Sequence, residues 1–205
     1  MEPEGVITPL PSFSFKESFG PSLVEVCTIL TLTLFSAPSP SVFVLIMAPS
    51  ALYQSIQSVV DAYFRSYTEA IEKGNISIYS AALAPNCVRQ IVPAGALGLP
   101  EQGLSNTEYE AVMAAEFAAI DTCSVEVKDV VIDENVLKAS ARAIYQPKLK
   151  GNDMAEQGEF FFSLTMQDNG DGELKIGHII EFMDLKWTEM YVEKVGRIGK
   201  ELGLA

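Results

Sequence analysis

The pattern of apolar and polar positions changes abruptly near Met47. Beyond it, apolar residues recur at three- and four-residue spacing over 51–73, which predicts a long amphipathic helix. Gly74 stands where the C-terminal cap of that helix belongs. A shorter helix is predicted over 76–83, because Pro85 disfavours helical backbone just before it. The organised part of the chain is therefore expected to open with two helices.

The pattern then predicts a short strand over 87–92 and a third helix over 106–121, which starts at a capping box formed by Ser105 and Glu108. After Cys123 the period becomes strand-like. The expected elements beyond it are strands over 125–132, 136–146, 158–167 and 174–183 and a terminal helix over 185–202. This order fits an α+β fold, in which one strongly bent antiparallel sheet carries helices on its concave face and closes into a cone around a cavity.

Residues 1–46 show neither the helical nor the strand period and are rich in Ser, Thr, Pro and apolar side chains. The apolar run near their end suggests a membrane anchor, but Pro38 and Pro40 interrupt it. The chain also begins with Glu2 rather than with the basic residues of a signal peptide. We interpret 1–46 as an extension that is disordered or not native, with an anchor or an atypical targeting segment as alternatives, and 47–205 as a single domain.

Composition narrows the classes of partner. The 205-residue chain has a formal net charge of −13 and no cluster of Lys and Arg, which argues against binding to nucleic acid or to a membrane surface. Its three cysteines lie far apart, which indicates small buried residues in a reducing compartment and hence a cytoplasmic protein. His178 is the only histidine, which excludes a zinc or iron site built on several histidines.

Three stretches carry a family resemblance: the opening helix VVDAYFRSYTEAIEKGN, the segment VRQIVPAGALGLP with the later SNTEY, and the closing strand KIGHIIEFMD. Over about 48–187 they resemble the NTF2-like superfamily and, within it, the SnoaL-like group with its fungal members. The resemblance implies the cone-shaped fold and a cyclase, isomerase or dehydratase of secondary metabolism that uses no metal and no organic cofactor. This fold also occurs in proteins that are not enzymes. The first alternative function is therefore a ligand-binding or scaffold protein, and the second is a transport adaptor.

Two charged residues interrupt apolar strands, Glu181 in IIEFM and Arg89 in CVRQIV. A desolvated carboxylate has a raised pKa, which suits a general acid or base, and a buried Arg can stabilise oxyanion charge. We predict that both face one apolar cavity, with a solvated face or a structural ion pair as the alternatives. Strand alternation places His178 on the opposite face from Glu181, and Asp184 is expected to cap the terminal helix.

The expected ligand is an apolar, oxygenated secondary metabolite of the polyketide or terpenoid type, which the resemblance implies. Aromatic residues would bind it through hydroxyls and stacking surfaces, although plain core packing is the alternative. The predicted substrate-binding residues are Tyr63, Tyr67, Tyr109, Tyr145 and Trp187. The run Phe160–Phe162 spans both faces of its strand, which favours a homodimer through the outer face of the sheet.

Overall fold

The computed structural model describes residues 48–170 and 172–203, so the prediction for residues 1–46 lies outside the described residues. Helix α1 (Ala51–Lys73) has the predicted bounds. The Ser50 side chain accepts a hydrogen bond from the Tyr53 N–H at its start, and Gly74 ends it in the left-handed conformation (φ 62°). Both ends are thus set by local capping, which a sequence pattern can detect.

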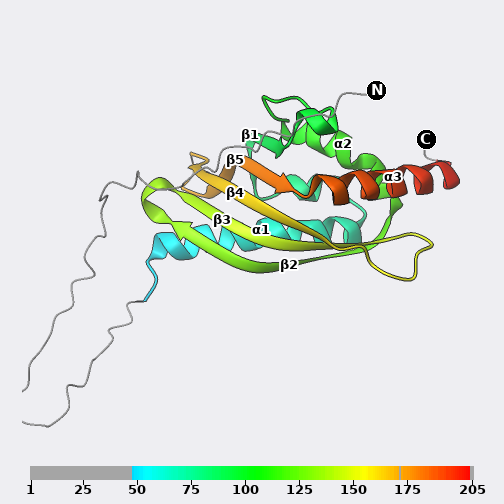
Figure 1. The fold of residues 1–205 in the computed structure, drawn as a ribbon. Helices are drawn as coiled ribbons and strands as arrows, with labels where there is room; N and C mark the ends of the chain where they lie inside the picture. Colours follow the sequence, from blue (N-terminus) through cyan, green and yellow to red (C-terminus); the bar gives the residue numbers. More distant parts are fainter. Residues whose placement is uncertain (1–47, 171, 204–205) are drawn as a thin grey trace, which may run out of the picture. The chain divides into compact units, whose positions relative to one another are not determined.

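The sheet has five strands. They are β1 (Leu83–Val92), β2 (Ile120–Asp133), β3 (Lys138–Leu149), β4 (Gly158–Asp168) and β5 (Leu174–Met183). Their order in space is β1-β5-β4-β3-β2, and the last four strands form the predicted antiparallel meander (Figure 1). Strand β1 runs parallel to β5, so the sheet is mixed. The predicted α+β class and bent sheet are confirmed.

The start of β1 differs from the prediction. The shorter helix is a 3₁₀ helix, η1 (Ile76–Ser80), and the strand already begins at Leu83 and runs through Pro85. Because β1 is an edge strand, a residue without an N–H costs it no ladder hydrogen bond. The pairing with β5 is irregular between Leu83 and Val88, where Pro85 lies.

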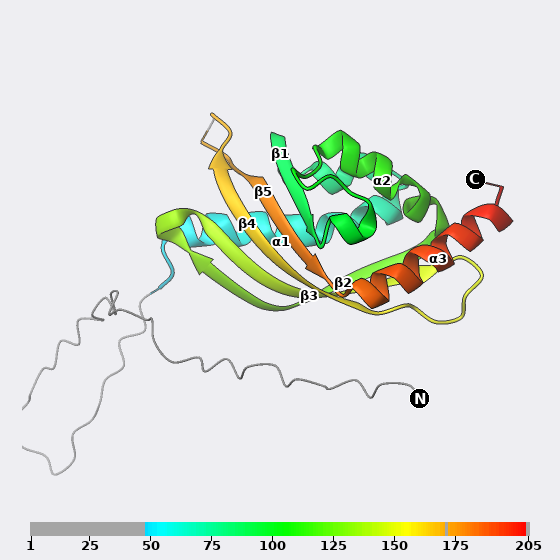
Figure 2. The same cartoon turned by 45° about the horizontal axis from the view of Figure 1, so that its top comes forward.

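Two further α-helices lie side by side at one end of the sheet (Figure 2). They are α2 (Asn106–Ala119) and α3 (Leu185–Glu201), and short 3₁₀ turns lie at η2 (Gly95–Leu97) and η3 (Glu134–Val136). The predicted capping box of Ser105 and Glu108 starts α2, and the Asp184 carboxylate accepts the Trp187 N–H at 3.0 Å to start α3. Among the described residues, no helix is long and apolar enough to cross a membrane.

The two faces of the sheet differ in what they contact. On the concave face, Phe160 and Phe162 are buried, and Phe162 packs edge-to-face on Phe64 of α1 at 5.2 Å between ring centroids. On the outer face, Phe161 pairs with Phe182 of β5, and these side chains are 52% and 46% exposed. The homodimer through this face stays a prediction.

Candidate functional site

The loop that follows β1 fixes Arg89. The Arg89 N–H donates to the Leu104 carbonyl, and the Arg89 carbonyl accepts from the Leu104 N–H, both at 2.8 Å. Gly103 makes this approach possible, because it has φ +91° and a side-chain carbon there would lie 2.8 Å from the Arg89 carbonyl oxygen. The backbone of Arg89 is therefore held from both sides, by β5 and by this loop.

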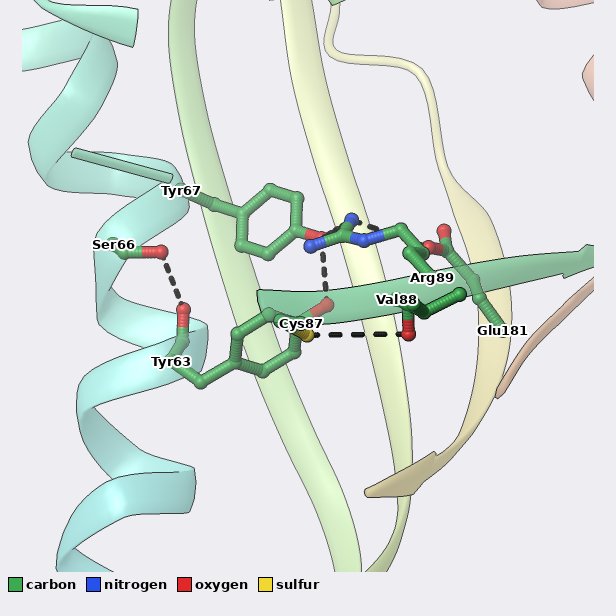
Figure 3. Close-up of polar contacts among 7 residues, drawn as sticks. All are labelled: Tyr63, Ser66, Tyr67, Cys87, Val88, Arg89 and Glu181. Atoms are coloured by element: carbon green, nitrogen blue, oxygen red, sulfur yellow. Dashed lines mark hydrogen bonds and ion pairs between the residues drawn. The ribbon is translucent and has the colours of Figure 1, made fainter. Parts of the chain in front are cut away.

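The Arg89 guanidinium lies in a buried, mainly aromatic environment and is 2% exposed. Its Nη1 donates to the Tyr67 hydroxyl at 3.0 Å and lies 3.4 Å from Glu181 Oε2 (Figure 3). The Tyr109 ring covers the guanidinium carbon at 3.5 Å from the ring centroid, which is a cation–π contact, and Tyr63 lies at 5.6 Å. Within the described residues, Nε and Nη2 have no hydrogen-bond acceptor. The cation is thus held by aromatic faces and one carboxylate.

An apolar cavity of about 650 Å³ lies between the concave face of the sheet and helices α2 and α3. Glu181 lines it, whereas Arg89 lies behind the wall and Tyr63 is fully buried away from it. The other predicted site residues that line the cavity are Tyr67, Tyr109, Tyr145 and Trp187. The structure therefore joins Arg89 and Glu181 as an ion pair and brings only the carboxylate to the cavity.

Burial dominates the electrostatics of Glu181. Removal from water raises the pKa of this carboxyl above its usual range, while the charge and hydrogen bond of Arg89 act in the opposite direction. The Glu181 side chain, on β5, is 7% exposed. His178 lies on the opposite face of the same strand and is only half-buried. A carboxyl in this environment can exchange a proton with a ligand in the cavity.

A second carboxyl, Glu116 of α2, also lines the cavity. The hydroxyls of Tyr145 and Tyr191 both donate to its Oε1, at 2.7 and 2.9 Å. Burial raises the pKa of Glu116 to about 7, although the two hydroxyls lower it and Glu181 raises it further. Sequence analysis missed this residue, yet it interrupts the apolar run AVMAAEFAAI as Glu181 interrupts its strand.

Other features of the described chain offer less chemistry. Within it, no group of three or more His, Cys, Asp or Glu side chains is placed to hold a metal ion. Cys87 and Cys123 are free and buried, as predicted. Another hollow, of about 590 Å³, runs along α1 beside the start of β5, but its ionisable residues include exposed ones such as Arg65. The candidate site is therefore the cavity with its two carboxyls.

Comparison with known proteins places the fold. No family model and no curated protein sequence matches the chain. Several solved structures match it in fold. A pinacolase, BvnE from Penicillium brevicompactum, matches 74% of this chain and 97% of its own at 14% identity, with a TM-score of 0.60. PrhC from Penicillium brasilianum matches 76% of this chain and 94% of its own at 15% identity, with a TM-score of 0.57. A candidate SnoaL-like polyketide cyclase from Jannaschia sp. CCS1 matches 70% of this chain and 94% of its own at 13% identity, with a TM-score of 0.52.

At these identities, the likeness to solved structures concerns the fold alone. The chain has the cone-shaped NTF2-like fold of SnoaL-like proteins, with the helices and the bent sheet enclosing a cavity, and the predicted resemblance is confirmed at that level. Because this fold supports unrelated activities, the function has to be argued from the cavity and its carboxyls.

Proposed function

We propose that the protein is a cofactor-free enzyme, an isomerase, cyclase or dehydratase, that transfers protons on an apolar, oxygenated secondary metabolite of the polyketide or terpenoid type. One observation carries this proposal: a buried carboxyl, Glu181, lies on the wall of an apolar cavity and has a raised pKa. A cavity of about 650 Å³ falls within the usual range for small-molecule sites. The names of two solved relatives, a pinacolase and a candidate polyketide cyclase, agree with this class of reaction.

In this proposal Glu181 is the catalytic base. Its carboxylate removes a proton from a carbon next to a substrate carbonyl, and the electron pair moves onto the carbonyl oxygen. Arg89 does not reach the cavity wall, so it acts on the substrate through Tyr67, whose hydroxyl accepts from Arg89 Nη1 at 3.0 Å. A tyrosine polarised in this way becomes a stronger donor to a developing oxyanion. Arg89 is thus a positioning residue in this reaction.

The walls of the cavity determine the class of substrate. Aromatic and aliphatic side chains cover most of it, among them Phe160, Phe162 and Trp187. Such a surface binds a fused or cyclised carbon skeleton through apolar contact, and the few polar groups orient its oxygen atoms. The side chains that can contact those oxygens are Tyr67, Tyr109, Tyr145 and Glu181.

The test uses a β,γ-octalone, a bicyclic ketone with an isolated ring double bond, whose conversion to the conjugated ketone is followed by ultraviolet absorption. The wild-type protein should accelerate this conversion over buffer. Glu181→Gln should lower the rate by roughly 10²–10⁴-fold, since it removes the base and keeps the shape. Glu181→Asp keeps the charge but withdraws it by one methylene, so its loss should be smaller.

Glu72→Gln is the matched control, because Glu72 is exposed on α1 and should leave the rate unchanged. Thermal unfolding of each variant is recorded, and rates are compared well below the lowest midpoint. A folded Glu181→Gln protein that isomerises the ketone at the wild-type rate would refute the proposal. Tight binding of the ketone without any acceleration would support a non-catalytic ligand-binding protein instead.

A further inference from the structure

The carboxyl of Glu116 joins three elements around the cavity. Glu116 comes from α2, Tyr145 from β3 and Tyr191 from α3, and all three residues line the cavity. Both hydroxyls donate to the same oxygen, Oε1. The other oxygen, Oε2, receives no hydrogen bond from the described residues, so the arrangement leaves it able to carry a proton. The charge of Glu181 also raises the pKa of Glu116.

A purely structural role explains this arrangement less well. A carboxylate that only joins elements away from water is usually paired with a cation. Glu116 has two neutral hydroxyl donors instead, and no ion pair involves it among the described residues. With a pKa of about 7, it is a mixture of acid and carboxylate at neutral pH. Two carboxyls with different partners in one cavity suit a division between acid and base.

We propose that Glu116 is a second catalytic residue, the acid that returns a proton to the substrate after Glu181 has removed one. This inference rests on the proposed function and adds the proton donor and the direction of proton flow. Tyr145 and Tyr191 are positioning residues, because they act on the reaction through the Glu116 carboxyl.

The step is balanced as follows. Glu181 takes a proton from the carbon between the carbonyl and the double bond, and the C–H electron pair forms a dienolate with the negative charge on oxygen. The carbonyl then re-forms, and the far carbon of the former double bond takes the proton from Glu116 Oε2, whose O–H electron pair stays on the carboxylate. The product is an isomer of the substrate. Proton exchange with water restores neutral Glu116 and ionised Glu181.

The experiment follows the β,γ-octalone in deuterated water with two readouts: deuterium uptake at the carbon next to the carbonyl, by NMR, and formation of the conjugated ketone, by absorption. Glu181→Gln should lose both, since it lacks the base. Glu116→Gln keeps an oxygen that can accept from both tyrosines, so it should retain deuterium uptake and lose conjugation by roughly 10²-fold or more. Glu72→Gln again serves as the control.

The pH profile separates an acid from a structural group. Conjugation needs protonated Glu116, so its rate should fall as the pH rises through about 7. Tyr191→Phe removes a donor that stabilises the carboxylate, so the pKa of Glu116 rises and the fall should move to higher pH. Wild-type conjugation by Glu116→Gln would overturn the inference and leave the proposed function intact. An equal loss of uptake and conjugation in Glu116→Gln would also overturn it.

A binding measurement decides the inference if the wild-type protein does not turn over the ketone, an outcome that would count against the proposed function. The probe is then 2-naphthol, a bicyclic mimic of the enol. Its ring would lie against Glu116, and a charged carboxylate beside an apolar ring is unfavourable, so its affinity should fall as the pH rises through about 7 in the wild type and stay level in Glu116→Gln. The same pH dependence in both proteins, or no binding by either, would overturn the inference.

Discussion

The two carboxyls of the cavity differ in exposure and in partners, because Glu181 is buried and Glu116 is half-buried. Glu181 lies on the sheet and has a full counter-charge, Arg89, at 3.4 Å. Glu116 lies on a helix and has only two neutral hydroxyls, at 2.7 and 2.9 Å. Burial raises the pKa of both, but only Glu181 has a cation that favours its ionised form. In our proposal, this difference in partners makes one carboxyl the proton acceptor and the other the proton donor.

The largest expected effect comes from removing the counter-charge. Arg89→Met leaves the Glu181 carboxylate buried without a cation, which should lower the free energy of unfolding by about 3–5 kcal/mol. For a domain of this size the melting temperature should fall by roughly 6–20 °C. Arg197→Met, an exposed position on α3, is the control and should melt like the wild type. If Arg89→Met has the stability of the control, the two carboxyls do not differ in the way described.

The next effect is the contribution of Glu116 to the pH dependence of stability. The unfolded chain releases this proton near the ordinary pKa of 4.5, whereas the folded chain keeps it to about 7. The protonated group therefore stabilises the fold below pH 4.5, and that stability is lost as the pH rises to about 7. Urea unfolding should show the wild type losing about 3 kcal/mol relative to Glu116→Gln between pH 4 and pH 8. A difference between the two proteins that does not change with pH would contradict this.

Sequence pattern predicted the fold well where local rules decide it. The bounds of α1 follow from apolar spacing and from caps at Ser50 and Gly74, all within a few residues. The start of β1 was predicted wrongly, because a proline such as Pro85, judged from the local sequence alone, indicates the end of an element. Only the position of β1 at the edge of the sheet makes this proline acceptable, and that position depends on β5.

The site was predictable in part for a similar reason. Arg89 and Glu181 are conspicuous because a charge in a short apolar strand is unusual. The exclusion of Arg89 from the cavity wall depends on the Tyr109 ring, which α2 brings over it from a distant part of the chain. Glu116 gave a weaker signal, because helices near a surface often carry glutamates. Its role depends on hydrogen bonds from Tyr145 and Tyr191, which lie on two other elements.

The smallest expected effect concerns assembly. Both carboxyls and their partners come from one chain, so a dimer through the outer face should leave the chemistry unchanged. Light scattering at micromolar concentration should report twice the 22.3 kDa chain mass. Phe161→Ser, at an exposed position on that face, should yield a monomer with wild-type rates and an unchanged pH profile. A loss of rate on dissociation would show that the two walls of the cavity depend on the partner chain.

Trp187 gives the cavity a built-in optical signal. It is the single tryptophan of the chain, it lines the cavity, and its indole stacks on the Tyr191 ring at 4.8 Å between centroids. All indole fluorescence of the protein therefore originates beside the Glu116 hydroxyl network. A ligand that displaces water from this ring changes the emission directly, so binding can be titrated without a label. Quenching by small solutes such as acrylamide would likewise report how far the cavity is open.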